Sequence, residues 1–405
     1  MRNTMKEEWI GRLNAATANE RLEALRELAG MYKSGALASP TTGLNVNNHI
    51  HTTFSFSPYS PVKAAYLAWD SGLATAGIMD HDSVGGVAEF IEAANIIGLP
   101  VTVGFECRCR MTDTPFEGRR INNPDQRSVA YMAMHGIPHQ MLGEAERFLA
   151  PYREKRNERN RKMVDKLDAM TRPYGLSFEY SRDVLPLSQY AFGGSVTERH
   201  ILYALCSALS DREMARYFLL GVFKSYLMED LYLNAEEELP HLDEFILLAD
   251  KLGAIPAYAY LGDVSLSVTG DKRGQAFEDA YLDELIPYLS SAGIRAITYM
   301  PARNSAEQLT RLITLCKKHS LLEISGEDIN SPLQSFICKK IETPEYSHLI
   351  DSAWALIGHE LACSKGLSKG MFTQETIMRI PKLSDRIKSF AALAKHQCSE
   401  REGTG

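Results

Sequence analysis

Long apolar segments are missing from this 405-residue sequence. No stretch approaches the roughly 18 uninterrupted apolar residues that a membrane-spanning helix requires. The first residues, MRNTMKEEWIGRLNAATANERLEALRELAG, carry too many charges for the apolar core of a secretory signal. The sequence therefore predicts a cytoplasmic protein that makes no membrane contact.

An excess of positive charge is missing as well. The formal net charge is −7 and the isoelectric point is about 5.9, so the chain has no overall attraction to nucleic acid or to an anionic membrane. Strong nucleic-acid binding is not expected. The hydrophobic content of 45% is ordinary for a globular protein and is enough to build a core.

Cysteines are few and scattered. There are 7, an odd number, which indicates a reducing compartment rather than a disulfide framework. Cys107 and Cys109 form the one close pair, and the single residue between them is too short for the Cys-x-x-Cys spacing of zinc and redox sites. We interpret them as ordinary strand or loop cysteines.

Short apolar segments alternate with helical stretches through the middle of the chain. The order strand, helix, strand is typical of a parallel sheet, and its repetition favours a closed or nearly closed barrel. We therefore predict an α/β fold, a distorted TIM-like (β/α)7 barrel over residues 45–340 with a helical insertion at about 176–250. A helical extension and linker (1–44), with one helix over 5–34, and a C-terminal extension (341–405) flank it.

Imidazole and carboxyl side chains follow the apolar strands at the points where those strands end. In barrels of this kind the catalytic groups come from the C-terminal ends of several strands. These residue types bind zinc, manganese or iron, and a carboxylate can bridge two ions. No cysteine accompanies them, which favours a hydrolytic centre with open positions over a closed thiolate site. The residues are His49, His51, Asp80, His81, Glu106, His135 and Asp328.

The same residues carry a family resemblance. The motifs HIHTTFSFS, IMDHDSVGGVAEF, VGFE, MAMHGIP and SGEDIN, in this order, resemble the polymerase and histidinol phosphatase (PHP) superfamily of metal-dependent phosphoesterases. The branch of small nucleotide and RNA phosphoesterases is the most similar, and TERHILYAL looks like part of its helical insertion. The resemblance covers about residues 45–335 and implies a seven-stranded distorted barrel with up to three metal ions at its mouth.

The resemblance also implies which residues hold each ion. The first ion would be held by His49, His51, Glu106 and Asp328. The second would share Glu106 and add His135 and His200; His139 is a rival for His135, and His200 is alternatively a structural residue of a helix face. For the third ion, Phe56 and Asn330 stand where ligands are usual and only His81 remains. We therefore expect two divalent ions (Zn, Mn or Fe), with His81 either supporting the ligands from behind or facing the substrate.

Other positions have predicted supporting roles. The candidate catalytic residues are His81, Asp80 and Arg199. We expect Asp80 to orient His81 by a hydrogen bond and Arg199 to bind phosphate oxygens. Arg119 and Arg120 are further phosphate candidates, and each arginine is alternatively a solvated surface charge. The segment IPAYAYLG lacks the His-Pro step that the family often has.

Two more features are open to a plain interpretation. The basic stretch 152–166 either receives a nucleotide or RNA end by phosphate contacts or is a solvated helix face. The remaining histidines that lack a comparable context are predicted to lie at the surface: His241, His319, His348 and His359.

The leading hypothesis is a metal-dependent hydrolase that uses a metal-activated water on a small phosphoester. The expected partner is a small phosphorylated substrate, with a nucleotide or an RNA end among the candidates. One alternative is a catalytically decayed barrel with a binding or regulatory role. The other is a binuclear hydrolase of the amidohydrolase type, because the same ligand types serve that chemistry.

Overall fold

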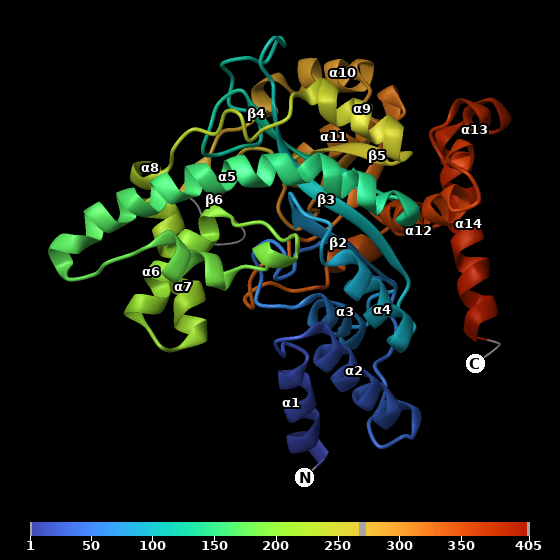
Figure 1. Cartoon of the computed structure of the whole chain (residues 1–405). Helices are drawn as coiled ribbons and strands as arrows, with labels where there is room; N and C mark the ends of the chain where they lie inside the picture. Colours follow the sequence, from blue (N-terminus) through green and yellow to red (C-terminus); the bar gives the residue numbers. More distant parts are fainter. Residues whose placement is uncertain (1, 267–272, 403–405) are drawn as a thin grey trace.

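A computed structural model describes residues 2–266 and 273–402 and is drawn in Figure 1. Its centre is a 7-stranded sheet with the strand order β1-β2-β3-β4-β5-β8-β9. The strands are β1 (Val46–Ile50), β2 (Thr75–His81), β3 (Val101–Arg110), β4 (Val129–His135), β5 (Ile255–Ala259), β8 (Ala296–Tyr299) and β9 (Leu322–Ser325). The predicted α/β fold with a nearly closed seven-stranded barrel is confirmed.

The barrel closes where β1 meets the chain that follows β9. The amide of His51 donates to the carbonyl of Ile329 at 3.0 Å, and the amide of Ile329 donates to the carbonyl of His49 at 3.1 Å. Gly326 lies at this seam, and a Cβ atom there would be only 2.5 Å from the Cβ of His49. Glycine therefore allows the two edges to approach each other beside the HIH motif.

Strand β4 runs in the opposite direction to both of its neighbours. It pairs antiparallel with β3, where Ala133 faces Glu106, and antiparallel with β5, where His135 faces Ile255. The expectation of a parallel sheet is therefore wrong for this strand. Its C-terminal end lies at the floor of the barrel, the end where the parallel strands begin, instead of at the mouth.

A layer of helices covers the outside of the barrel. Each buries an apolar face, and the main hydrophobic cluster includes Tyr66, Phe90, Phe245 and Leu285. The helices are α3 (Pro61–Asp70), α4 (Val87–Ile97), α9 (Leu242–Leu252), α10 (Leu282–Ala292) and α11 (Ala306–His319). A short hairpin, β6 (Val264–Leu266) with β7 (Arg273–Gln275), follows β5 and was not predicted from the sequence.

The N-terminal extension contains two helices, α1 (Arg2–Arg12) and α2 (Ala18–Lys33), where one helix was predicted over 5–34. The break has a local cause. The Thr17 side chain accepts from the Glu20 amide while the Glu20 carboxylate accepts from the Thr17 amide, a capping box that starts the second helix. A buried ion pair of 2.6 Å between Arg21 and Glu89 joins α2 to α4.

The C-terminal extension seals the floor of the barrel. Its helices are α12 (His348–Cys363), α13 (Gln374–Arg379) and α14 (Leu383–Glu402). Leu356 of α12 shares a hydrophobic cluster with Ala133, Ala257 and Leu322 of the strands. The carboxylate of Glu360 accepts from the Val103 amide at 2.9 Å, which ties α12 to β3.

This packing overturns the prediction for His359. Its exposed fraction is only 2%, whereas the sequence analysis placed it at the surface. Its ring lies 2.8 Å from the Gly253 carbonyl and accepts from the Met371 amide at 2.9 Å. His359 therefore connects α12 to the loops at the floor of the barrel through contacts of its buried ring.

A helical segment lies between β4 and β5. It contains α5 (Leu142–Thr171), α6 (Glu198–Leu209), α7 (Glu213–Tyr226) and α8 (Met228–Leu231). Helix α5 has 30 residues, which corresponds to about 45 Å, and Figure 1 shows it crossing the molecule toward α6, α7 and α8. Near its start, His139 contacts Glu360 at the floor, and further along Arg156 contacts Asp82 at the mouth.

These helices form a second hydrophobic cluster that includes Val164, Leu167, Leu202, Leu220 and Phe56. Helices α6, α7 and α8 lie within the predicted insertion at about 176–250, whereas α5 precedes it, and the proposed division into domains remains a prediction. Among the described residues, no helix combines the length and apolar character needed to cross a membrane.

Candidate metal centre

Three side chains converge at the mouth of the barrel. His49 is the second-to-last residue of β1, His51 comes directly after that strand, and Glu106 lies in β3. The candidate ligand atoms of the three side chains are all within 4.8 Å of one another. His49 and His51 point to the same side because side chains alternate along an extended segment. All three are buried, and within the described residues this is the only such group of three or more His, Cys, Asp or Glu side chains.

Two further groups border this cluster. The carboxylate of Asp328, which follows β9, lies 3.1 Å from Nε2 of His51. Nδ1 of His81, at the end of β2, lies 3.1 Å from the Glu106 carboxylate. The rings of His51 and His81 stack with their centroids 4.6 Å apart. The structure therefore brings together the predicted first-ion set and His81.

The charges of the cluster stabilise one another. Burial alone would raise the pKa of Asp328, but the imidazoles of His51 and His49 and the guanidinium of Arg199 hold it far below its usual range. Burial lowers the pKa of His49, and the Glu106 and Asp328 carboxylates outweigh this and raise it overall. Burial, reinforced by neighbouring positive charge, lowers the pKa of His81 well below its usual value. His81 is therefore neutral, with a lone pair available.

Asp80 supports a different histidine from the one expected. Its carboxylate accepts hydrogen bonds of 2.6 Å from the amide and hydroxyl of Thr52 and from the hydroxyl of Ser55. The Ser55 oxygen lies 3.3 Å from Nδ1 of His51. Asp80 and His81 are adjacent on β2 and point to opposite faces, so the predicted hydrogen bond between them is wrong. Asp80 instead orders the turn that holds His51.

The predicted ligands of a second ion lie outside the cluster. His135 is at the end of β4, and neither of its ring nitrogens has a hydrogen-bond partner among the residues that the structure describes. Nδ1 of His200 accepts from the Thr197 amide at 3.0 Å at the start of α6. Burial lowers the pKa of each ring to about 3, with a smaller contribution from a neighbouring charge. Their assignment as ligands remains a prediction.

The positions that break the third set have structural partners. The ring of Phe56 packs edge-on against His200 with centroids 5.0 Å apart, inside the second hydrophobic cluster. The Asn330 side chain accepts from Arg199 at 2.8 Å and donates to Asp328. Asn330 thus holds a guanidinium beside the carboxylate, at a position where the resemblance implies a third-ion ligand.

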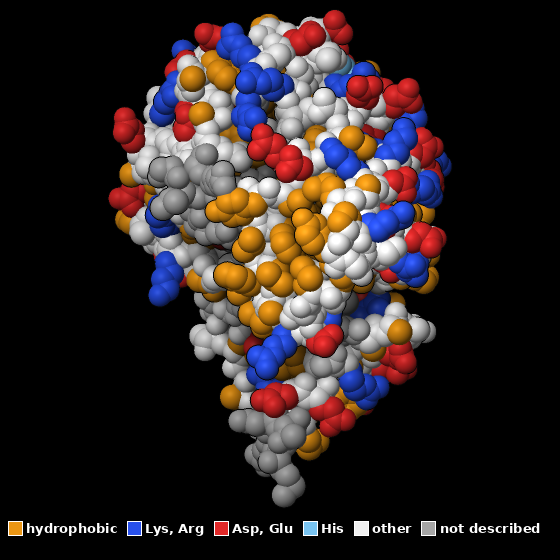
Figure 2. All heavy atoms as spheres, turned by 90° about the vertical axis from the view of Figure 1, so that its left-hand side faces the viewer, with side chains coloured by type: hydrophobic (Ala, Val, Ile, Leu, Met, Phe, Trp, Pro, Cys, Tyr) orange, Lys and Arg blue, Asp and Glu red, His pale blue; other side chains and the backbone are white. Residues whose placement is uncertain are grey.

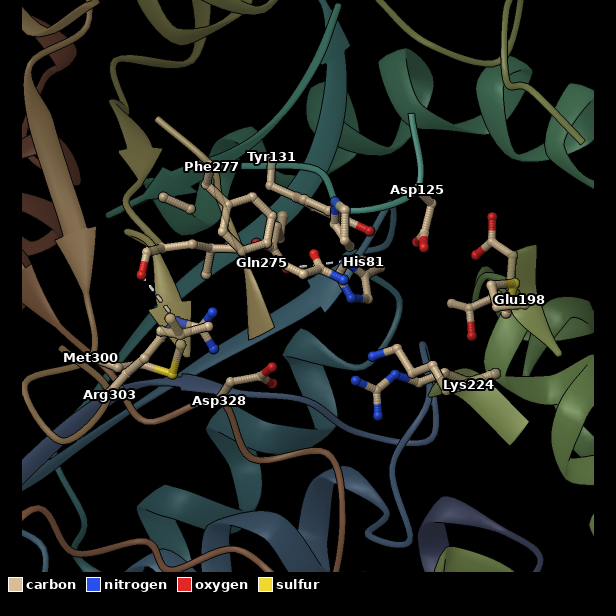
Figure 3. Close-up of a pocket in the computed structure, with 18 of the residues that line it drawn as sticks. His81, Asp125, Tyr131, Glu198, Lys224, Gln275, Phe277, Met300, Arg303 and Asp328 are labelled. Atoms are coloured by element: carbon tan, nitrogen blue, oxygen red, sulfur yellow. Dashed lines mark hydrogen bonds and ion pairs between the residues drawn. The ribbon is translucent and has the colours of Figure 1, made fainter. Parts of the chain in front are cut away.

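A pocket opens from the cluster, and Figure 3 shows its lining. Its lining includes His81, Glu106 and Asp328. Lys224 of α7 and Arg303, from the loop after β8, point toward the cavity from opposite sides of Asp328 (Figure 3). Apolar walls complete the pocket: Tyr131, Met228, Ala259, Leu261, Phe277 and Met300.

Tyr131 was missed by the sequence analysis. It lies on β4 opposite Arg108, two positions before Ala133, which faces Glu106. Because alternate residues share a face, Tyr131 points to the interior at the height of the mouth, and its ring centroid is 5.9 Å from that of His81. Recognising β4 as antiparallel would have selected Tyr131 in place of His135.

The predicted phosphate-binding arginines separate into two groups. Arg199 lines the pocket. Arg119 instead pairs with Glu284 at 3.3 Å and lies over the ring of Tyr281, while Arg120 donates to the Pro124 carbonyl at 2.7 Å. Neither Arg119 nor Arg120 is among the residues that line the pocket.

One side of the basic stretch 152–166 is exposed, as expected for a solvated helix face, and its contact with a nucleotide or an RNA end remains a prediction. Three of its arginines, Arg153, Arg156 and Arg159, are buried and paired with acids. Arg156 contacts both Asp82 and Glu198. These ion pairs tie α5 to α6 and to the residue that follows β2, and the two acidic partners of Arg156 hold its guanidinium in place in the pocket lining.

Comparisons with known proteins show the fold. No family model and no curated protein matches the chain. One similar structure is a protein from Bifidobacterium adolescentis named as a candidate metal-dependent phosphoesterase, with 22% identity, a TM-score of 0.52, and coverage of 75% of this chain and 94% of that one. Another is an amidohydrolase from Chromobacterium violaceum with bound sulfate and no metal, with 20% identity, a TM-score of 0.55, and coverage of 73% and 90%.

Proposed function

We propose that the protein is a metal-dependent phosphoesterase. The observation that carries the proposal is the buried cluster of His49, His51 and Glu106, completed by Asp328, at the wall of a pocket with basic side chains. Both similar structures bear the names of hydrolases, and one name specifies metal-dependent phosphoester chemistry.

The donor set fits a divalent ion. Two imidazoles and two carboxylates, with no thiolate, suit zinc, manganese or iron, and they leave positions open. Bound there, such an ion would lower the pKa of a water molecule and polarise a phosphoryl oxygen. His49, His51, Glu106 and Asp328 would hold one ion, and His135, whose pKa is lowered by burial and by the neighbouring His49, remains a proposed ligand of a second together with His200.

The residues around the ion site have distinct roles in the proposal. Arg199, held by Asn330, binds phosphate oxygens with its planar guanidinium. His81 is neutral and faces the pocket, so it accepts a hydrogen bond or a proton at a ring nitrogen. The hydroxyl of Tyr131 offers a further donor, because burial keeps it protonated by raising its pKa.

The substrate is proposed to be a small phosphoester that carries an apolar or planar group. Phe277, Met228 and Met300 line the pocket together with the basic side chains and would bury such a group. A nucleotide-like ester meets both conditions. The Chromobacterium violaceum structure contains bound sulfate, an oxyanion of similar shape to phosphate.

Turnover of model esters tests the proposal. Protein loaded in turn with zinc, manganese or iron is assayed with p-nitrophenyl phosphate, bis-p-nitrophenyl phosphate and a nucleotide panel. We expect hydrolysis that requires metal and that falls at least tenfold in Arg199→Ala, with little change in Arg119→Ala, whose guanidinium lies outside the pocket. Metal-loaded protein that is inert toward every ester would refute the proposal.

Amide or lactone hydrolysis is the second candidate. It is favoured by the same His and carboxylate donors and by the name of the Chromobacterium violaceum structure. Metal-dependent turnover of an amide or lactone panel, with none on phosphoesters, would select it. Tight metal binding without turnover of any substrate would select a binding role.

A further inference from the structure

Helix α7 exposes an apolar ridge to solvent. Its members recur every four residues: Met214 (54% exposed), Phe218 (67%), Val222 (38%) and Tyr226 (63%). Leu209, at the end of α6, adds another apolar side chain that is 50% exposed. Figure 2 looks at the side of the molecule where α6 and α7 lie, and hydrophobic side chains gather there in one patch. We call these five side chains the α7 ridge.

The ridge is not required for the folding of its own helix. The opposite face of α7 packs into the second hydrophobic cluster through Tyr217 and Leu220, which are 7% and 4% exposed. No charged residue interrupts the segment from Tyr217 to Phe223. A surface helix normally carries polar side chains on its outer face, so an apolar outer face indicates a partner.

We propose that the α7 ridge binds the α7 ridge of a second copy of this chain in an antiparallel, two-fold symmetric dimer. Side chains spaced by four residues form the ridges that interdigitate when two helices cross. A two-fold axis that crosses the outer face of α7 at the height of residue 220 brings Phe218 of one copy beside Val222 of the other. The same axis brings Met214 beside Tyr226. Each contact then joins a larger side chain to a smaller or more flexible one, which permits close packing.

The exposed area matches what a dimer needs. With aromatic side chains of about 200 Å² each, the exposed fractions of the ridge correspond to roughly 500 Å² per copy. Two copies would bury roughly 1,000 Å² from these side chains alone, which is the lower bound of a specific interface. Polar residues around the ridge would add to this area as a hydrated rim.

The charges at the ends of the ridge argue against an anionic membrane as the partner. Four exposed carboxylates, Asp211, Glu213, Glu229 and Asp230, flank the helix, against one exposed guanidinium at Arg212. An anionic lipid surface would repel them. In the dimer they lie at the solvated rim, where water and salt screen their repulsion.

Sedimentation equilibrium and light scattering at micromolar concentrations test the dimer. We expect twice the chain mass of 45.2 kDa for the wild type and the mass of one chain for Phe218→Glu. The matched control is Leu247→Glu, because Leu247 on α9 is also 67% exposed and lies on a different part of the molecule; it is expected to remain dimeric. Far-ultraviolet circular dichroism checks that both variants are folded.

Cross-linking tests the orientation of the two helices. We expect a short bis-maleimide to link Val222→Cys into a covalent dimer, and to link neither the wild type nor Leu247→Cys. A wild type that is monomeric up to about 100 μM, or a dimer that survives Phe218→Glu, would overturn the proposal. A monomer that co-sediments with phosphatidylserine vesicles through the ridge would assign the surface to lipid and would also overturn it.

Discussion

At the scale of single residues, the two histidines of the HIH motif are held in different ways. His51 is fixed from both ring nitrogens, by Ser55 on one side and Asp328 on the other. His49 lies 3.5 Å from Glu106, and its backbone forms part of the barrel seam. The Asp328 carboxylate therefore interacts with both histidines, at 3.1 Å from His51 and through its charge on His49.

Removing His49 is predicted to empty the centre. His49→Ala deletes one of four donors and leaves buried carboxylates without a cation, so we expect metal content per chain, measured by elemental analysis after gel filtration, to fall at least tenfold. His396→Ala is the control, since that side chain is 74% exposed on α14. Unchanged metal content in His49→Ala would refute the assignment of the site.

A second prediction concerns the pH dependence of stability at the barrel floor. The hydrogen bond to Glu360 raises the pKa of His139 above its ordinary value, although burial opposes it. The contribution is therefore fully present below pH 6.5 and is lost as the pH rises through the raised pKa. Because the His139 side chain is 49% exposed, its size should stay below about 1 kcal/mol.

The measurement is thermal unfolding of the wild type and His139→Ala at pH 6 and pH 8.5. We expect the variant to be less stable at pH 6 and nearly equal to the wild type at pH 8.5, while His396→Ala is equal to the wild type at both. An effect of the same size at both values would show that charge on His139 has no part in the contact.

Strand-end reasoning could predict part of this chemistry from the sequence. His49, His51, Glu106 and Asp328 were identified because each follows or ends an apolar strand, and the structure brings all four together. The direction of the strand that ends at His135 was wrong in the same reasoning, because a strand's direction depends on its tertiary partners and cannot be read from its own residues. His359 was placed at the surface because nothing in the sequence shows that α12 packs under the barrel.

At the scale of elements, the seam between β1 and the end of β9 has no room for an added side-chain atom at Gly326. Gly326→Ala would place a Cβ atom 2.5 Å from the Cβ of His49 and 2.8 Å from its amide nitrogen. The amide nitrogen is a backbone atom and the position of the Cβ atom is fixed by the backbone, so the strain cannot be relieved by rotating a side chain. We expect a loss of about 1–3 kcal/mol in the free energy of unfolding, together with weaker metal binding.

The matched control is Gly143→Ala in α5, where a Cβ atom meets nothing within 4 Å. Alanine is a better helix former than glycine, so this variant should gain about 0.5–1 kcal/mol. Urea denaturation of both variants gives the two values. A Gly326→Ala protein as stable as the wild type would mean that the seam is looser than the structure indicates.

Local sequence signals explain some elements and miss others. The capping box at Thr17 and Glu20 is visible in the sequence, and it accounts for the break between α1 and α2 that the apolar stripe concealed. The hairpin of β6 and β7 has three residues in each strand, too few for a periodic pattern to identify.

At the scale of the whole molecule, the C-terminal extension behaves as part of the barrel. Leu356 is fully buried against the floor, so Leu356→Ala is predicted to lower the free energy of unfolding by about 2–5 kcal/mol. Met378→Ala, at a residue 69% exposed on α13, should change it by less than about 0.5 kcal/mol. If Leu356→Ala unfolds α12 while the barrel signal persists, the extension folds independently of the barrel.

The direction of β4 has one more consequence for the path of the chain. Strand β4 runs from the mouth of the barrel to its floor, and α5 returns from the floor to the mouth. The β4–α5 unit therefore begins and ends at the mouth and leaves the direction of the other strands unchanged. The chain that follows α5 at the mouth can therefore be lengthened without changing the order of the strands in the sheet. The helices that follow α5 above the mouth can therefore change in length and sequence during evolution while the cluster of His49, His51 and Glu106 keeps its position.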